Sequence, residues 1–342
     1  MSTDAFPTRR AILGGAAISV LVGGFSYDFD AQGEKATWEL VNNAAPWKPR
    51  QGGNIVSFAD QLWLLGGSST ADNQQFRDIW SSRNGVDWTK QADVAEWKNA
   101  PSKMVSVFQE RLWLVSGRQV WCSLSGKTWE LVTEQGPWSY REGASLVSFR
   151  DRLFLLGGFW PLPDGSKIRY FNDVWSSGDG KVWELAQVHC DWRERSFQGV
   201  TVFNDALALV GGGRWETQEV EKDVWSSFDG RAWSRIRSHL PSLRFSPSPT
   251  VYRGALWILG TSAPGPTTQL LYSWDGKWWH VYRSKSQGSV SPSAALITFR
   301  DKLWAISAAG EKEGAHIWSM AIPANWSGNW FREGRNRLGS IQ

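Results

Sequence analysis

The chain has 342 residues, and its 42% hydrophobic and 20% charged composition excludes an intrinsically disordered protein. The formal net charge is +4, from 37 basic and 33 acidic residues without a long basic run, so we expect no nucleic-acid partner. Two Cys and four scattered His exclude a disulfide framework and the usual zinc sites, and we expect no metal and no cofactor.

We expect the first 30 residues to be an export signal or an anchor segment. Arg9 and Arg10 precede an apolar, Gly/Ala-rich segment of about 15 residues, which is too short for a comfortable membrane span. Thr8–Leu13 resembles the twin-arginine signal, an address that bacterial export reads on folded proteins. We expect a periplasmic protein, or one that faces the periplasm from an uncleaved N-terminal anchor, its only membrane contact. A short amphipathic or disordered arm is the alternative.

The rest of the chain repeats one pattern about every 48 residues, counted between aromatic landmarks at positions 58, 108, 149, 203, 252 and 299. In the third copy, Phe149 precedes Leu-Phe-Leu-Leu-Gly-Gly at 153–158, and Asp-Val-Trp-Ser-Ser at 173–177 and Asp-Gly at 179–180 follow. The apolar run suits a buried strand, the alternating segment suits the next strand, and Asp-Gly suits a tight hairpin turn. Each copy therefore predicts one four-stranded blade of a β-propeller.

The sixth copy lacks its last Trp segment, and a matching segment stands at the other end of the chain. Thr37–Val41 is identical to Thr128–Val132, the corresponding segment of the second copy. We expect it to form the fourth strand of the sixth blade, beside the strand around Trp318, because ring closure removes exposed sheet edges. The predicted fold is all-β: a six-bladed propeller over residues 36–322, closed by an N-terminal strand and followed by a C-terminal tail at 323–342. We expect a monomer.

The Gly pair after an apolar strand and the repeated Trp resemble the kelch-repeat family. The resemblance implies a propeller of the galactose oxidase and kelch type, although the second, fifth and sixth copies lack the Gly pair. Copper radical oxidases share that fold, but their Tyr–Cys signature is missing here, and no nucleophile elbow, phosphate loop or zinc motif is present. The catalytic residues are therefore unknown. Cys122 and Cys190 are either buried small residues or a disulfide between neighbouring blades.

Fifteen of the 25 Trp occupy repeated positions, and we expect them to form the core between the blades. A second series has a Trp-x-x-Arg spacing just before the innermost strand of a blade, in Trp47–Arg50, Trp138–Arg141 and Trp192–Arg195, with weaker versions at Lys103 and Arg244. In kelch propellers the corresponding basic residue commonly lies at the channel mouth. Sixfold geometry would then bring these side chains toward one axis.

Two long loops after the Gly-Gly strands, at 159–172 and 213–222, should emerge on the same face and add aromatic and acidic groups. The candidate ligand-binding residues are Trp47, Arg50, Lys103, Trp138, Arg141, Glu142, Trp160, Trp192, Glu194, Arg195, Trp215 and Arg244. Guanidinium groups suit carboxylates, and indoles suit the C–H faces of sugars. The structural alternative is that each Arg braces its own loop or pairs with a nearby acid.

These residues favour an exported binding module for a carbohydrate, an acidic small molecule or a protein partner, and not an enzyme. The alternative is a sugar-ring isomerase or mutarotase acting on an acidic sugar. It resembles the N-acetylneuraminate epimerases at the level of fold and compartment only, with Glu142, Glu194 or Glu216 as acid/base groups. A scaffold without a small-molecule ligand is the third hypothesis, since fold does not imply function.

Overall fold

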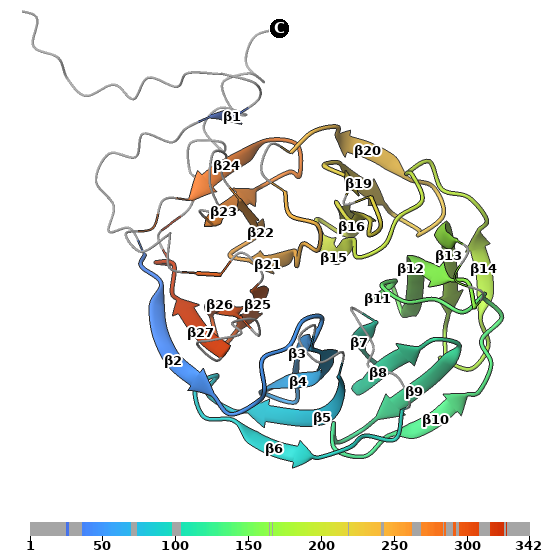
Figure 1. Ribbon diagram of the computed structural model, residues 1–342. Helices are drawn as coiled ribbons and strands as arrows, with labels where there is room; N and C mark the ends of the chain where they lie inside the picture. The colour runs from blue at the N-terminus through green and yellow to red at the C-terminus, as the bar shows by residue number, and fades with distance from the viewer. Residues whose placement is uncertain are drawn as a thin grey trace, which may run out of the picture.

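The protein is a six-bladed β-propeller, in which six antiparallel four-stranded sheets form a closed ring around a central axis (Figure 1). The computed structural model describes residues 25–26, 36–69, 74–97, 104–163, 165, 167–217, 219–240, 243–261, 268–282, 284, 290–291, 294–307, 315–324 and 326. These residues are all-β and include no helix, as the repeat pattern predicts.

Each blade runs from an innermost strand at the axis to an outer strand at the rim (Figure 1). The innermost strands are β3 (Asn54–Phe58), β7 (Val105–Phe108), β11 (Ser145–Phe149), β15 (Gly199–Phe203), β21 (Thr250–Tyr252) and β25 (Ala295–Phe299). The second strands are β4 (Gln61–Ser68), β8 (Arg111–Ser116), β12 (Arg152–Pro161), β16 (Ala206–Val210), β22 (Ala255–Thr261) and β26 (Lys302–Ile306). The third strands are β5 (Gln75–Ser82), β9 (Gln119–Ser123), β13 (Ile168–Ser177), β19 (Val224–Ser227), β23 (Thr268–Ser273) and β27 (Ala315–Met320). The outer strands are β6 (Thr89–Ala92), β10 (Glu130–Thr133), β14 (Glu184–Gln187), β20 (Ser234–Arg237), β24 (Trp279–Tyr282) and β2 (Glu39–Ala45).

Two short elements lie outside this scheme. The strands β17 (Gly213–Arg214) and β18 (Glu219–Val220) form a hairpin of their own between β16 and β19. The strand β1 (Phe25–Ser26) pairs in parallel with β24 at the outer edge of the fifth blade.

The aromatic landmark of each repeat marks the hairpin between the first two strands. Arg150 and Asp151 have φ of 45° and 54°, and Phe149 pairs with Arg152, as in a two-residue hairpin turn. In the second strand, the Trp63 indole donates a hydrogen bond of 3.0 Å to the Phe58 carbonyl, across the same turn. The Leu-Trp-Leu-Leu run therefore supplies both a buried strand and a lock for its hairpin.

A glycine turn between the third and outer strands locks each of the first five blades against its neighbour, and in the third to fifth blades its sequence is Asp-Gly. The Ser177 hydroxyl accepts a 2.8 Å hydrogen bond from the Gly180 amide, and the Trp183 indole donates to the Gly180 carbonyl at 3.0 Å. In the second blade the equivalent Gly126 has φ of 75°, and a Cβ there would lie 2.6 Å from the Trp63 ring of the first blade. Glycine is needed at this position both for the turn and for the packing.

The N-terminal strand closes the ring, as the sequence predicts. The outer strand of the sixth blade is β2, which pairs antiparallel with β27 and places Leu40 opposite Trp318. Closure leaves the sixth blade with a full sheet although its last strand comes from the start of the propeller.

Part of the C-terminal tail packs on the propeller. Trp326 lies 5.1 Å from the Trp257 ring and 5.5 Å from the Trp274 ring, measured between centroids, in the cluster between the fifth and sixth blades. Cys122 and Cys190 are both buried and free, so they form no disulfide. Among the residues described, no helix has the length and apolar character needed to cross a membrane. Arg9 and Arg10, the pair that resembles a twin-arginine signal, lie outside the described residues.

Candidate functional site at the central channel

Three of the predicted basic residues form the same buried ion pair in three blades. Arg50, Arg141 and Arg195 are at most 2% exposed. Their guanidinium groups bind Asp78, Asp173 and Asp223 respectively, two residues before the Trp of the third strand. The pairing is bidentate: Arg141 Nη1 and Nη2 lie 2.7 and 2.9 Å from the two Asp173 oxygens.

The backbone and the neighbouring Trp complete this unit. Arg195 Nη1 also donates to the Gly211 carbonyl at 3.0 Å, 16 residues along the chain, and the Trp225 indole donates to Asp223 at 2.7 Å. Burial would raise the pKa of Asp223, but the hydrogen bonds and charge of Arg195 and the Trp225 hydrogen bond outweigh it, so the pKa lies below its usual value. The unit is a fully compensated buried charge pair.

The sequence predicted that these basic groups converge on the axis, and for Arg50, Arg141 and Arg195 the structure shows instead that each pairs with an Asp of its own blade. Each guanidinium lies inside its own blade, because the Asp beside the third strand supplies a carboxylate that compensates the buried charge. Lys103 lies outside the described residues.

The tryptophans of the second series are also part of the core. Trp47, Trp138 and Trp192 are 4%, 1% and 0% exposed. Trp138 meets Trp183 edge-on with a centroid separation of 5.0 Å, and the pairs Trp47–Trp88 and Trp192–Trp233 have the same T-shaped arrangement. These indoles therefore present no open face to a ligand.

The acidic candidates Glu142 and Glu194 lie in the segments that lead into β11 and β15, and each contacts a nearby side chain. Glu142 accepts a 2.8 Å hydrogen bond from the Tyr140 hydroxyl, and Glu194 lies 3.6 Å from Arg214. Trp160 is partly buried on β12, opposite Arg169. None of these residues lines the central cavity described below.

Arg244 occupies the equivalent position in the fifth blade but lacks the ion pair. It precedes Gly260 by the same 16 residues that separate Arg195 from Gly211. Gly260 pairs with Gln269, whereas the Gly211 amide donates to the Asp223 carbonyl. Gln269 therefore occupies the position that an Asp holds in the first, third and fourth blades.

The exchange leaves Arg244 without a carboxylate partner among the described residues. Its Nη2 donates to the Ala294 carbonyl of the sixth blade at 2.9 Å, and its Nε is buried without a hydrogen-bond partner. Burial lowers the pKa of the Arg244 guanidinium to about 10, so the group is still charged at neutral pH.

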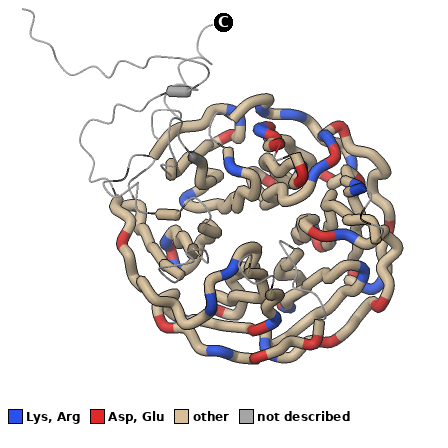
Figure 2. The backbone as a smooth tube through the Cα atoms, viewed as in Figure 1, with Lys and Arg blue, Asp and Glu red and all other residues tan. Residues whose placement is uncertain are grey.

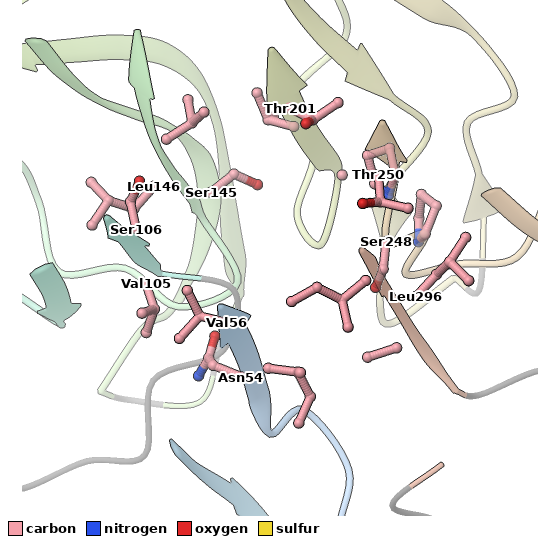
Figure 3. Close-up of a pocket in the computed structure, with 18 of the residues that line it drawn as sticks. Asn54, Val56, Val105, Ser106, Ser145, Leu146, Thr201, Ser248, Thr250 and Leu296 are labelled. Atoms are coloured by element: carbon pink, nitrogen blue, oxygen red, sulfur yellow. The ribbon is translucent and has the colours of Figure 1, made fainter. Parts of the chain in front are cut away.

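Arg244 lines a central cavity of about 480 Å³ between the six innermost strands. Serine and threonine hydroxyls from several blades surround it, together with the Asn54 amide and aliphatic side chains, as Figure 3 shows for Ser106, Ser145, Thr201 and Ser248. Among the described residues that line this cavity, Arg244 is the only charged one. The cavity thus combines a neutral, hydroxyl-bearing wall with one uncompensated cation.

Charges elsewhere are distributed evenly. Basic and acidic positions are interspersed around the ring (Figure 2). Within the described part of the chain, no group of three or more His, Cys, Asp or Glu could hold a metal ion. The central cavity is therefore set apart by a single charge and not by a charged surface.

No protein-family model matches this chain, and no curated protein is significantly similar to it. The function of the cavity is therefore inferred from its own residues.

One signal for this site is present in the sequence. The repeats pair Arg with Asp in the first, third and fourth blades, and the fifth keeps Arg but has Gln269 instead of Asp. Phe197 and Phe245, which lie beside the cavity-lining residues Gln198 and Arg244, carry no repeat signal and were not predicted.

Proposed function

We propose that the protein is a binding module that takes an anionic small molecule, a carboxylate, in its central cavity, with Arg244 as the main contact. The observation that carries this proposal is the contrast between Arg244 and Arg195. The Arg at this repeat position is neutralised by an Asp in one blade, and in the other it lies at the cavity wall with no carboxylate partner among the described residues.

The physical chemistry of the cavity supports an anion. A charge-assisted hydrogen bond contributes roughly 1.5–3 kcal/mol, and a carboxylate would supply the acceptors that Arg244 lacks. The cavity of about 480 Å³ lies within the range of roughly 300–1,000 Å³ that is common for small-ligand sites. Hydroxyl groups such as those of Ser106 and Thr201, which line the cavity, can donate to and accept from the rest of the ligand.

The repeat residues and the N-terminal segment support a kelch-type propeller that is exported from the cytoplasm. The Gly pairs and repeated Trp support a kelch-type propeller, and Arg9 and Arg10 support export by the twin-arginine route. The ligand would then be met outside the cytoplasm. Export is tested by replacing both Arg with Lys, which should leave the protein in the cytoplasm.

The binding proposal is tested by calorimetric titration with lactate and citrate. Wild-type protein should bind at least one of them, and Arg244→Met should weaken that binding at least tenfold. Arg231→Gln is the matched control, because Arg231 is exposed in the Asp-Gly turn of the fourth blade. Equal binding by Arg244→Met and wild type would refute the proposal.

A further inference from the structure

A second cavity lies in the outer part of the first blade, which β5 and β6 form at the rim of the ring (Figure 1). Its volume is about 540 Å³, and it is lined by β5, by residues in and just after β6, and by the segment at 46–50 that leads toward β3. It shares no lining residue with the central cavity. A ligand held here would therefore occupy a site that is independent of Arg244.

This rim cavity has an excess of positive charge. Its charged lining residues are Lys48, Arg50, Arg77, Lys90, Asp78 and Asp93, which give a net charge of +2 at neutral pH. Arg50 and Asp78 neutralise each other in their buried pair. Lys90 lies 2.9 Å from Asp93, but these side chains are 43% and 85% exposed, so water screens their attraction. Lys48 and Arg77 have no carboxylate partner among the described residues.

The fourth blade carries cations at the same three positions. A constant offset of 145 residues relates the two blades and places Arg193, Lys222 and Arg235 at the positions of Lys48, Arg77 and Lys90. The contacts agree with this correspondence: Arg235 Cζ lies 5.6 Å from the Trp225 ring centroid, and Lys90 Nζ lies 5.1 Å from that of Trp80. The fourth blade is therefore an internal reference for the rim cavity.

Acidic side chains compensate the first of these cations in the fourth blade. Arg193 Nη1 lies 2.5 Å from a Glu219 oxygen and 3.2 Å from a Glu221 oxygen. The same offset places Gln74 and Phe76 at the positions of these two acids, and both line the rim cavity. The first blade thus keeps the three cations and lacks the two carboxylates.

The charge and the shape of the rim cavity favour a phosphate monoester. Such a group carries a charge of about −1.5 to −2 at neutral pH, which matches the net charge of the lining, and its three acceptor oxygens point in different directions. Lysine binds phosphate as a point charge, and arginine binds it with its planar fork. Pro46 and Val94 are exposed and line the same cavity, so they can contact the organic part of the ester.

We propose that the rim cavity binds the phosphate group of a small phosphorylated molecule through Lys48, Arg77 and Lys90. The inference goes beyond the proposed function, because Arg244 and the central cavity take no part in it. A phosphatidic acid headgroup presents the same phosphate chemistry from a membrane, so the experiment separates the two sources.

The test is calorimetric titration with glycerol 3-phosphate at neutral pH. Wild-type protein should bind it, and the double variant Lys48→Gln, Lys90→Gln should bind at least tenfold more weakly. Gln74→Glu, which supplies a carboxylate at the position of Glu219, should also weaken binding. Arg235→Gln is the matched control, because Arg235 occupies the position of Lys90 in the fourth blade, and it should bind as wild type does.

The ligand class is tested with three further titrants. Glycerol lacks the phosphate, and dimethyl phosphate lacks the second negative charge, so both should bind wild type at least tenfold more weakly than glycerol 3-phosphate. Vesicles of phosphatidylcholine and phosphatidic acid should retain no protein. Vesicle binding without binding of glycerol 3-phosphate would overturn the proposal in favour of a membrane surface.

Three other results would overturn the inference. The double variant, folded as judged by thermal unfolding, would refute the site if it bound glycerol 3-phosphate like wild type. Equal weakening by Arg235→Gln would show that the effect reflects overall charge and not the rim cavity. Loss of glycerol 3-phosphate binding in Arg244→Met would place the phosphate in the central cavity, which would reject the rim site and leave the proposed anion site standing.

Discussion

Arg244 and Gln269 occupy the positions that an ion-paired Arg and Asp hold in three other blades, and among the described residues the Arg244 guanidinium makes one hydrogen bond, to the Ala294 carbonyl. An unpaired, partly buried guanidinium is destabilising, because it loses hydration without gaining a counter-charge. A fold that keeps such a group at a cavity wall has a local instability that an anionic ligand would relieve.

One substitution restores the Asp that the fifth blade lacks at position 269. Gln269→Asp should give Arg244 the bidentate partner that Arg195 has in Asp223. We expect the melting temperature to rise and the affinity for lactate or citrate to fall at least tenfold, since the ligand would then compete with an internal carboxylate. Gln119→Asp, at the same repeat position of the second blade, is the matched control. A variant that still binds the anions like wild type would show that Arg244 is not the contact.

The two kinds of Arg should differ in their effect on stability. Arg195→Met leaves Asp223 buried without its partner and should cost about 3–5 kcal/mol of unfolding free energy. Arg244→Met removes a charge that has no carboxylate partner among the described residues, so it should cost far less than Arg195→Met. Urea unfolding of both variants measures the contrast. Similar losses in the two variants would mean that Arg244 is as well compensated as Arg195.

The buried pairs also set the response to acid. Burial opposes ionisation of Asp78 and Asp223, but hydrogen bonds from Arg and Trp place both pKa values below the usual 3.8. A carboxyl with a lower pKa in the folded state binds fewer protons there than in the unfolded state. Its stabilisation is therefore complete above about pH 4 and is lost as the pH falls through the folded-state pKa. Urea unfolding between pH 5 and 2 should show this loss, with a shallower decline in Asp223→Asn. A decline of equal steepness in that variant would assign the acid sensitivity to other groups.

The tail should contribute to stability through one side chain. Trp326 stacks among Trp257, Tyr272 and Trp274, and Trp326→Ala should lower the unfolding free energy by roughly 1–3 kcal/mol. Trp278→Ala is the control, because Trp278 is 42% exposed and its loss should cost less than about 0.5 kcal/mol. Both are measured by thermal unfolding. Equal effects would show that the tail is not held by this stack.

The repeat period predicted the fold because each repeated piece has a local physical task. The aromatic landmark and the strand-two Trp close one hairpin, and Ser-x-Asp-Gly closes another, so sequence spacing translates directly into strands. The closing strand was predictable because Thr37–Val41 copies Thr128–Val132.

The site was less predictable, because its key contacts join residues far apart in the chain. Trp-x-x-Arg spacing does not reveal that the Arg lies against an Asp 28 or 32 residues later, in the third strand of its own blade. Phe197 and Phe245 occur in irregular segments and have no periodic pattern to mark them.

The most direct test of the account is the side-chain NMR signal of Arg244 in protein labelled with 15N-arginine. Titration with citrate should shift the Arg244 Nε resonance in a saturable manner and leave the Arg50, Arg141 and Arg195 resonances in place, because those three groups are already paired. An Arg244 resonance that does not move at saturating citrate, or that moves no more than the exposed Arg231, would contradict the assignment of an anion site to the central cavity.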